Sequence, residues 1–221
     1  MQKFDTPAPI SAVLDIPAGR VQFIAADRAD TAVEVLPADA TKGRDVKMAE
    51  QTRVEYGDGV LRIEASAKNR YFGPSGSIEV TVQLPAGSQV EVKAASAELR
   101  AVGRFGDVAF EGAHGAIKID EAASARLTSV AGDVTVGRLG GSAQISTTKG
   151  DIRVAESVGG TLVVSTQAGD VSIGAAAGVS AALDAGTTFG RIHNSLKNAE
   201  GTAALNIHAT TAYGDIVARS L

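Results

Sequence analysis

The sequence contains no cysteine and no tryptophan, and aromatic residues account for only 4% of its 221 residues. The absence of cysteine excludes disulfide bonds, thiolate metal ligands and a cysteine nucleophile. Apolar residues nevertheless make up 44% of the chain, and many of them are Ala and Val. Thin, regular layers of small and β-branched side chains suit a stacked sheet better than a spherical core.

Long apolar runs and a strong charge imbalance are also missing. No stretch approaches the roughly 18 consecutive apolar residues that a membrane helix needs, and the start, Met1-Gln2-Lys3-Phe4-Asp5, has no apolar signal region. We therefore expect no signal peptide, no integral membrane segment and a cytoplasmic location. The formal net charge of -4, with both signs interspersed, argues against a nucleic-acid partner.

A Gly-Asp-Val/Ile step recurs through the second half of the chain at nearly constant spacing. The steps begin at Gly106, Gly132, Gly150, Gly169 and Gly214, and the central ones are 18 and 19 residues apart. Gly115-Ala116-Ile117 and Gly190-Arg191-Ile192 are related steps. Periods near twenty residues are typical of stacked units, each of which cannot bury its apolar face alone.

Apolar residues alternate with polar ones on both sides of each step. Around Gly150, for example, Ala143 and Ile145 precede the step and Ile152 and Val154 follow it. This period of two predicts two short strands per unit, each with one buried face, joined at corners that require glycine. The predicted fold is all-β: a flattened β-solenoid with about 18 residues per coil.

A hydroxyl residue stands three positions before most of the glycines, in a column formed by Ser129, Thr147, Thr166, Thr187 and Thr211. The alternation directs these side chains inward, near a corner. We therefore interpret the column as structural, with hydroxyls that hydrogen-bond inside the stack.

The N-terminal third lacks a strict repeat, and we expect an irregular all-β cap there. Its candidate strands are Ile10–Ile16, Arg20–Ala26, Thr31–Leu36, Arg53–Tyr56, Val60–Ala65, Ile78–Leu84 and Gln89–Ala94. The candidate helix is Asp45–Gln51. Because no linker-like segment divides the chain, we predict a single domain over 1–221, with the cap in 1–90 and the regular repeats in 91–221.

These Gly-Asp-Val/Ile units, together with the turns Pro17-Ala18-Gly19 and Leu84-Pro85-Ala86-Gly87, resemble the bacterial putative-adhesin β-strand-repeat family of unknown function. The resemblance covers most of the chain and is strongest over roughly 80–220. It implies a β-solenoid, and some members are tied to adhesion or cell-envelope stress. The resemblance transfers no catalytic residue.

The aspartates of the steps are the sharpest candidate site. Asp133, Asp151 and Asp170 should stack about 4.8 Å apart, and calcium could neutralise such a column. The favoured interpretation is that each carboxylate accepts N–H bonds within its own turn. Arg191 supports it, since it takes the Asp position between Asp170 and Asp215 and could pair with both. We therefore predict no metal and no cofactor.

Two further segments are candidates for binding. Arg70, Tyr71 and Phe72 lie in a Gly- and Pro-containing loop and have the side chains that anchor protein interfaces. The alternative is that this loop covers the open end of the solenoid. At the C-terminus, the last repeat step exposes Ile216 and Val217 without a cap sequence after them, which predicts a homo-oligomer through this coil.

The sequence thus predicts a non-enzymatic, adhesin-like binding or scaffolding module with a protein partner or a second copy of itself. The alternative is a carbohydrate-active enzyme or lectin that uses the solenoid face, with a glycan as ligand. The three histidines, His114, His193 and His208, are scattered and are expected to be exposed.

Overall fold

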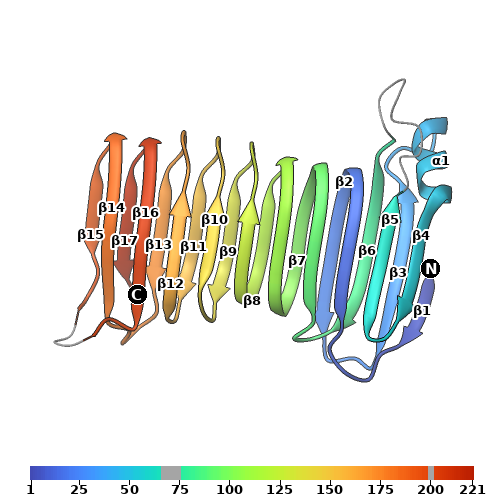
Figure 1. Cartoon of the computed structure of the whole chain (residues 1–221), viewed down its shortest axis with the longest axis horizontal. Helices are drawn as coiled ribbons and strands as arrows, with labels where there is room; N and C mark the ends of the chain where they lie inside the picture. The colour runs from blue at the N-terminus through green and yellow to red at the C-terminus, as the bar shows by residue number, and fades with distance from the viewer. Residues whose placement is uncertain (66–75, 199–201) are drawn as a thin grey trace. The chain divides into compact units, whose positions relative to one another are not determined.

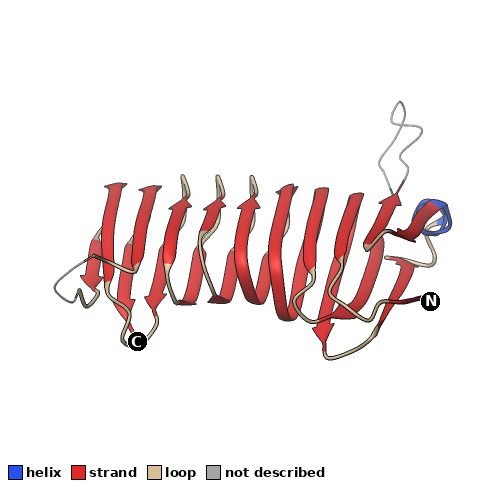
Figure 2. Cartoon of the chain, turned by 60° about the horizontal axis from the view of Figure 1, so that its bottom comes forward, coloured by secondary structure: helices blue, strands red, loops and turns tan. Residues whose placement is uncertain are grey.

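The computed structural model describes residues 1–65, 76–198 and 202–221. The chain divides into two compact units, Met1–Gly115 and Ala116–Leu221. Strands account for most of each unit, and the helix belongs to the first (Figures 1 and 2). The all-β prediction is confirmed, whereas the prediction of a single domain stays a prediction.

The elements follow one another in this order. Unit 1 contains β1 (Gln2–Asp5), β2 (Ser11–Ala26), β3 (Asp30–Pro37), α1 (Gly43–Gln51), β4 (Thr52–Gly57), β5 (Val60–Ala65), β6 (Ile78–Pro85) and β7 (Gln89–His114). Unit 2 contains β8 (Ile117–Thr128), β9 (Val134–Leu139), β10 (Ala143–Ser146), β11 (Ile152–Ser157), β12 (Gly160–Ser165), β13 (Val171–Ala175), β14 (Ala181–Phe189), β15 (Ile192–Ser195), β16 (Leu205–Tyr213) and β17 (Ile216–Ser220).

Unit 2 is a stack of coils whose strands pair in parallel. One column of strands contains β8, β10 and β12, and Ile145 aligns there with Leu127 and Val164. The other column contains β9, β11 and β13, where Ile152 aligns with its equivalents in the neighbouring coils. These aligned side chains are buried, so the predicted β-solenoid and its inward-facing positions are confirmed.

The end of the stack does not follow the order of the chain. β16 lies between β12 and β14, and β17 lies between β13 and β15 (Figure 1). The last repeat step is therefore an inner coil, in which Ile216 is buried and Val217 is half-buried. The expectation that these two residues lie at an open end was wrong, because the returning chain inserts between two earlier coils.

The first coil of unit 1 is made by a single long strand, β2. β2 runs through Pro17, so that the two strands predicted at Ile10–Ile16 and Arg20–Ala26 are continuous. It pairs in parallel with β7 on one side and with β5 and β6 on the other. The first coil of the chain is therefore an inner coil of unit 1.

The predicted irregular cap is confirmed in unit 1. Antiparallel strands complete its edges: β3 pairs with β6, β1 with β3, and β4 with β5. The helix α1 begins two residues before the predicted Asp45 and ends at Gln51 as expected. The Asp45 side chain is buried, and it accepts a hydrogen bond from the N–H of Ser77 at 3.0 Å.

The corners of unit 2 explain why the repeat requires glycine. Gly169 has a φ of +154°, and a Cβ placed on it would lie 2.1 Å from the carbonyl oxygen of Gly150 in the coil below. Gly214 has the same relation to Gly169, at 2.0 Å. The coils thus approach one another too closely at this corner for any side chain.

Candidate functional site

The aspartates of the repeat form a hydrogen-bonded ladder along one corner of unit 2. Oδ1 of Asp133 accepts the N–H of Asp151 at 2.9 Å, and Oδ1 of Asp151 accepts the N–H of Asp170 at 2.8 Å. Oδ1 of Asp170 accepts the N–H of Asp215 at 2.7 Å. The predicted stacking is confirmed. The predicted partner was wrong, because each carboxylate binds the next coil and not its own turn.

Arg191 ends this ladder. Its N–H donates to Oδ1 of Asp215 at 2.8 Å, and its guanidinium lies 3.8 Å from Oδ2 of the same residue. Sequence order suggested a place between Asp170 and Asp215, but the inserted coil brings those two aspartates together and leaves Arg191 beyond them. A cation therefore stands where the next carboxylate would otherwise repel Asp215.

The hydroxyl column is buried, as predicted, except at Thr187 in the outermost coil, which is half-buried, and its partners are main-chain carbonyls. Thr166 Oγ1 donates to the carbonyl of Gly150 at 3.2 Å, and Thr211 Oγ1 donates to that of Gly169 at 3.0 Å. Thr187 makes the equivalent bond to Gly214 at 3.0 Å. The hydroxyls therefore satisfy carbonyls at the glycine corner and are not directed toward solvent.

These contacts give the repeated polar residues of unit 2 a structural role. Within residues 1–65, 76–198 and 202–221, no group of three or more His, Cys, Asp or Glu side chains is placed to hold a metal ion. The carboxylates of Asp133, Asp151 and Asp170 are exposed and separated by one coil each, which suits hydrogen bonding to the main chain more than a shared cation.

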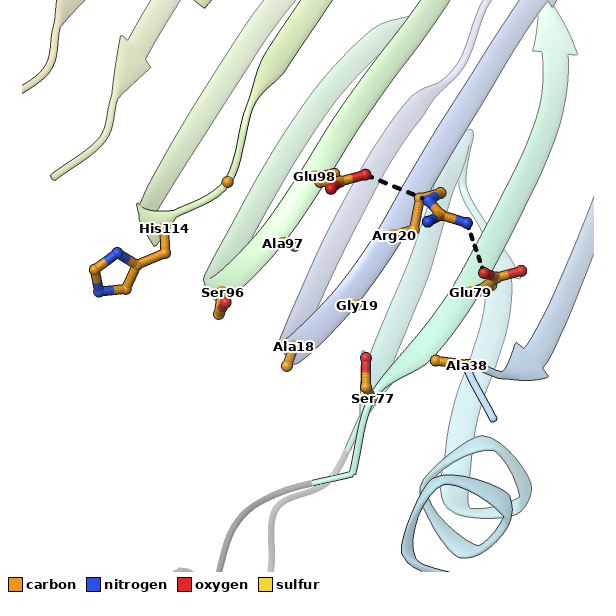
Figure 3. A pocket seen from close by; sticks show the side chains of 11 residues that line it. Ala18, Gly19, Arg20, Ala38, Ser77, Glu79, Ser96, Ala97, Glu98 and His114 are labelled. Atoms are coloured by element: carbon orange, nitrogen blue, oxygen red, sulfur yellow. Dashed lines mark hydrogen bonds and ion pairs between the residues drawn. The ribbon is translucent and has the colours of Figure 1, made fainter. Parts of the chain in front are cut away.

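A polar hollow of about 310 Å³ lies on unit 1, where charged side chains that do not belong to the repeat meet (Figure 3). Arg20 on β2 lies directly between Glu79 on β6 and Glu98 on β7, because the parallel registers align these three residues. The Arg20 guanidinium is 2.8 Å from Oε1 of Glu79 and 3.4 Å from Oε2 of Glu98.

The three charged side chains are well exposed. Their side-chain exposures are 60% for Arg20, 41% for Glu79 and 62% for Glu98. Ion pairs at such exposure contribute about 0–1 kcal/mol, so the fold does not depend on them. They remain available to a ligand that can replace or extend the pairs.

The rest of the hollow is made of small and hydroxyl side chains. Ser77 and Ser96 supply hydroxyls, while Ala18, Gly19 and Ala97 leave the main chain close to the surface. His114 also lines the hollow, but Figure 3 shows its ring apart from the Arg20 group. The site offers hydrogen-bond donors and acceptors on a shallow floor, and it suits a polar ligand.

The sequence-based candidates have different outcomes. Asp133, Asp151 and Asp170 belong to the ladder, whereas Arg70, Tyr71 and Phe72 lie outside the described residues. His114, His193 and His208 are exposed, as expected, and Nδ1 of His208 lies 3.2 Å from Oδ2 of Asp184. The Arg20 group was missed because its members are 59 and 78 residues apart.

The stacked parallel coils, the glycine corners and the aspartate ladder define a β-solenoid. The family model of the Toastrack DUF4097 domain matches residues 13–220, and the chain belongs to that family. No curated protein matches the chain. Within the part of the chain that the structure describes, no helix is long and apolar enough to span a membrane.

Solved structures resemble this chain at low sequence identity. One, described as a "putative lipid binding protein" from Parabacteroides distasonis ATCC 8503, is 10% identical, with a TM-score of 0.53, over 98% of this chain and 95% of that chain. A "putative adhesin" from Bacteroides fragilis NCTC 9343 is also 10% identical, with a TM-score of 0.47 and the same coverages. At this identity the likeness to the first of these structures, whose TM-score is above 0.5, establishes the fold alone.

Proposed function

We propose that this chain is a non-enzymatic binding module, adhesin-like in the sense that a folded surface holds a partner. One observation carries the proposal. The polar groups that repeat from coil to coil in unit 2 are engaged by main-chain atoms. The solenoid therefore acts as a rigid support. The side chains that bind a partner are those that do not recur from coil to coil.

The Arg20 hollow is the binding surface that we assign to the module. Arg20 presents N–H donors held in place by two carboxylates, and Glu79 and Glu98 each have a further oxygen as an acceptor. Such alternating donors and acceptors on three neighbouring strands match a ligand with several hydroxyl or amide groups. A glycan or a polar peptide segment has this chemistry.

A carbohydrate-active enzyme is the second candidate, and the two glutamates beside one hollow favour it. Paired carboxylates can serve as acid and base in glycoside hydrolysis. Against it, both glutamates accept hydrogen bonds from the same guanidinium. A guanidinium shared by both glutamates gives neither of them the separate environment that distinguishes an acid from a base.

A binding screen with product analysis tests the proposal. Glycan and peptide arrays are probed with the wild type, with Arg20→Met and with Arg153→Met, an exposed arginine on β11 as matched control. We expect saturable binding that Arg20→Met abolishes, that Arg153→Met preserves, and that yields no cleaved product. Turnover of a ligand would show that the chain is an enzyme. Binding that Arg20→Met does not weaken would show that the Arg20 hollow is not the binding site.

A further inference from the structure

The strands β14 and β15 form the outermost coil of unit 2, called the end coil from here on. β14 pairs with β16 and β15 pairs with β17 (Figure 1). Within the described residues, neither strand has a partner along its other edge. The end coil therefore presents two open strand edges, one at the end of each column of strands.

The exposure of equivalent residues shows that the core of unit 2 reaches the surface here. Ile192 follows its glycine by two positions, and it is 43% exposed. The residues at the same place in the inner coils, Val134, Ile152, Val171 and Ile216, are 1% exposed or less. Leu183 is likewise half-exposed, whereas its neighbour Ile207 is buried. The apolar positions of the end coil lack the covering coil that the others have.

The main chain of β14 is open at the same place. Leu205 donates its N–H to the carbonyl of Ser180, and successive residues of a strand direct their main-chain groups to opposite edges. The main-chain N–H and C=O groups of Ala182 and Asp184 are therefore directed toward β16. Those of Leu183 and Ala185 are directed away from it, toward the open edge. Ala181, in the outward set, already donates to the carbonyl of Lys197. The open part of this edge is thus centred on Ala185.

β14 also lacks the residues with which proteins protect an open edge. β14 contains no proline and no lysine, and Asp184 is its one charged residue. An exposed aromatic pair lies at its end, where Phe189 stacks on Tyr213 with ring centroids 5.0 Å apart. Open main-chain groups, exposed core residues and aromatic rings thus occur together on one coil.

We propose that the end coil binds the end coil of a second copy of this chain, with the strands antiparallel across a two-fold axis. Inside unit 2, a coil is covered by another coil of the same repeat, as β16 and β17 cover β12 and β13. A second copy supplies such a coil. A two-fold axis through Ala185 satisfies both open edges at once and closes the assembly at a dimer.

Charge selects an axis across the strands, through Ala185, over a two-fold axis that runs along them. Arg191 lies at the corner between β14 and β15, and its side chain is 80% exposed. The axis through Ala185 places the two arginine corners at opposite ends of the interface. An axis along the strands would pair β14 with β15 of the partner copy and place the corners side by side, where like charges repel. With the axis through Ala185, Asp184 faces Gly186 of the partner copy and not its Asp184.

Sedimentation equilibrium on the purified full chain tests the proposal. We expect a mass of twice 22.4 kDa at high micromolar concentration for the wild type. Ile192→Lys, which places a charge among the exposed core residues that a second coil would cover, and Ala185→Pro, which removes an outward N–H, should both give the monomer mass. Val163→Lys changes an exposed apolar residue on β12 and serves as matched control; it should remain a dimer.

Circular dichroism accompanies each variant, so that loss of the dimer is scored only on folded protein. A wild type that stays monomeric at high micromolar concentration would overturn the proposal. So would a dimer that survives Ile192→Lys. An open polymer that grows with concentration would overturn the two-fold arrangement, because it requires contact between unlike surfaces.

Discussion

Asp39 shows how one side chain organises the approach to α1. Its Oδ1 accepts hydrogen bonds from the Oγ1 of Thr41 at 2.6 Å and from the N–H of Thr41 at 3.0 Å. Lys42 lies 3.1 Å from Oδ2. The hydrogen bonds from Thr41, with a smaller contribution from Lys42, lower the pKa of Asp39 to about 2.

The pKa of Asp39 can be measured directly. Because the folded-state pKa lies below the unfolded value, the ionised carboxylate favours folding above about pH 4, and this contribution is lost as the pH falls through about 2. Thr41→Val removes the strongest bond and should raise the pKa toward its ordinary value. An NMR titration of the carboxyl carbon checks this, and an unchanged pKa in Thr41→Val would contradict it.

Gly169 is a second residue whose role depends on contact between coils. Gly169→Ala would place a Cβ 2.1 Å from the carbonyl oxygen of Gly150, at a backbone geometry that side chains rarely adopt. We expect a loss of about 3 kcal/mol or more in unfolding free energy. Gly186→Ala is the control, since nothing lies within 4 Å of its Cβ. Urea denaturation should separate the two variants clearly.

Alternation along a strand decides which substitutions an element tolerates. Ile145 on β10 is 0% exposed, and Ile145→Asp would bury an unpaired carboxylate between the two columns. We expect a loss of about 4 kcal/mol or more, enough to unfold a domain of ordinary stability.

The matched variant is Thr135→Asp on β9, where the side chain faces outward. Its parallel neighbours are Lys118 and Arg153, so that a new carboxylate gains cross-strand partners of opposite charge. We expect a change within about 0.5 kcal/mol. Equal thermal melting temperatures for the two variants would show that the inward and outward assignments are incorrect.

The hydrogen bonds of the aspartate ladder should contribute to stability between neighbouring strands. Asp151→Ala removes the acceptor for the N–H of Asp170 and should cost about 1 kcal/mol. Asp151→Asn keeps an oxygen at that place and should cost less.

Calcium and chelators test the alternative role of the same ladder. If the carboxylates serve only the main chain, neither millimolar calcium nor excess chelator changes the melting temperature. A calcium site would raise it through mass action. A calcium-dependent rise that disappears in Asp151→Asn would show that the ladder is a metal site.

At the scale of the whole molecule, protection of the main chain should follow position in the stack. Inner strands of unit 2 such as β11 have partners on both sides, whereas β14 and β15 have one each. In the monomeric Ile192→Lys variant, amide hydrogens of the end coil should exchange faster than those of β11. Slowest exchange in the end coil would contradict the observed order of strands.

The same comparison separates the C-terminal strands from the end coil. β16 and β17 end the chain, yet they lie between other strands. We therefore expect them to be protected like inner strands, whereas an ordinary chain terminus frays.

Much of the molecule follows from local pattern. The period of two identified the inward positions, such as Ile145, because a strand has no other way to bury one face. The recurring glycines identified the corners, since the coils there approach within the reach of a Cβ. The aspartate and hydroxyl columns follow from the same spacing, because a fixed period places equivalent residues one above another.

Tertiary structure alone decided which coils are neighbours. Every coil offers nearly the same apolar face to the next, so that periodicity aligns Gly214 with Gly169 as well as with Gly190 and cannot order them. The return of the chain after β15 settles this order, and it moves the open end from Ile216 to Ile192. The Arg20 group arises in the same way, since residues 20, 79 and 98 meet only through the register of three parallel strands.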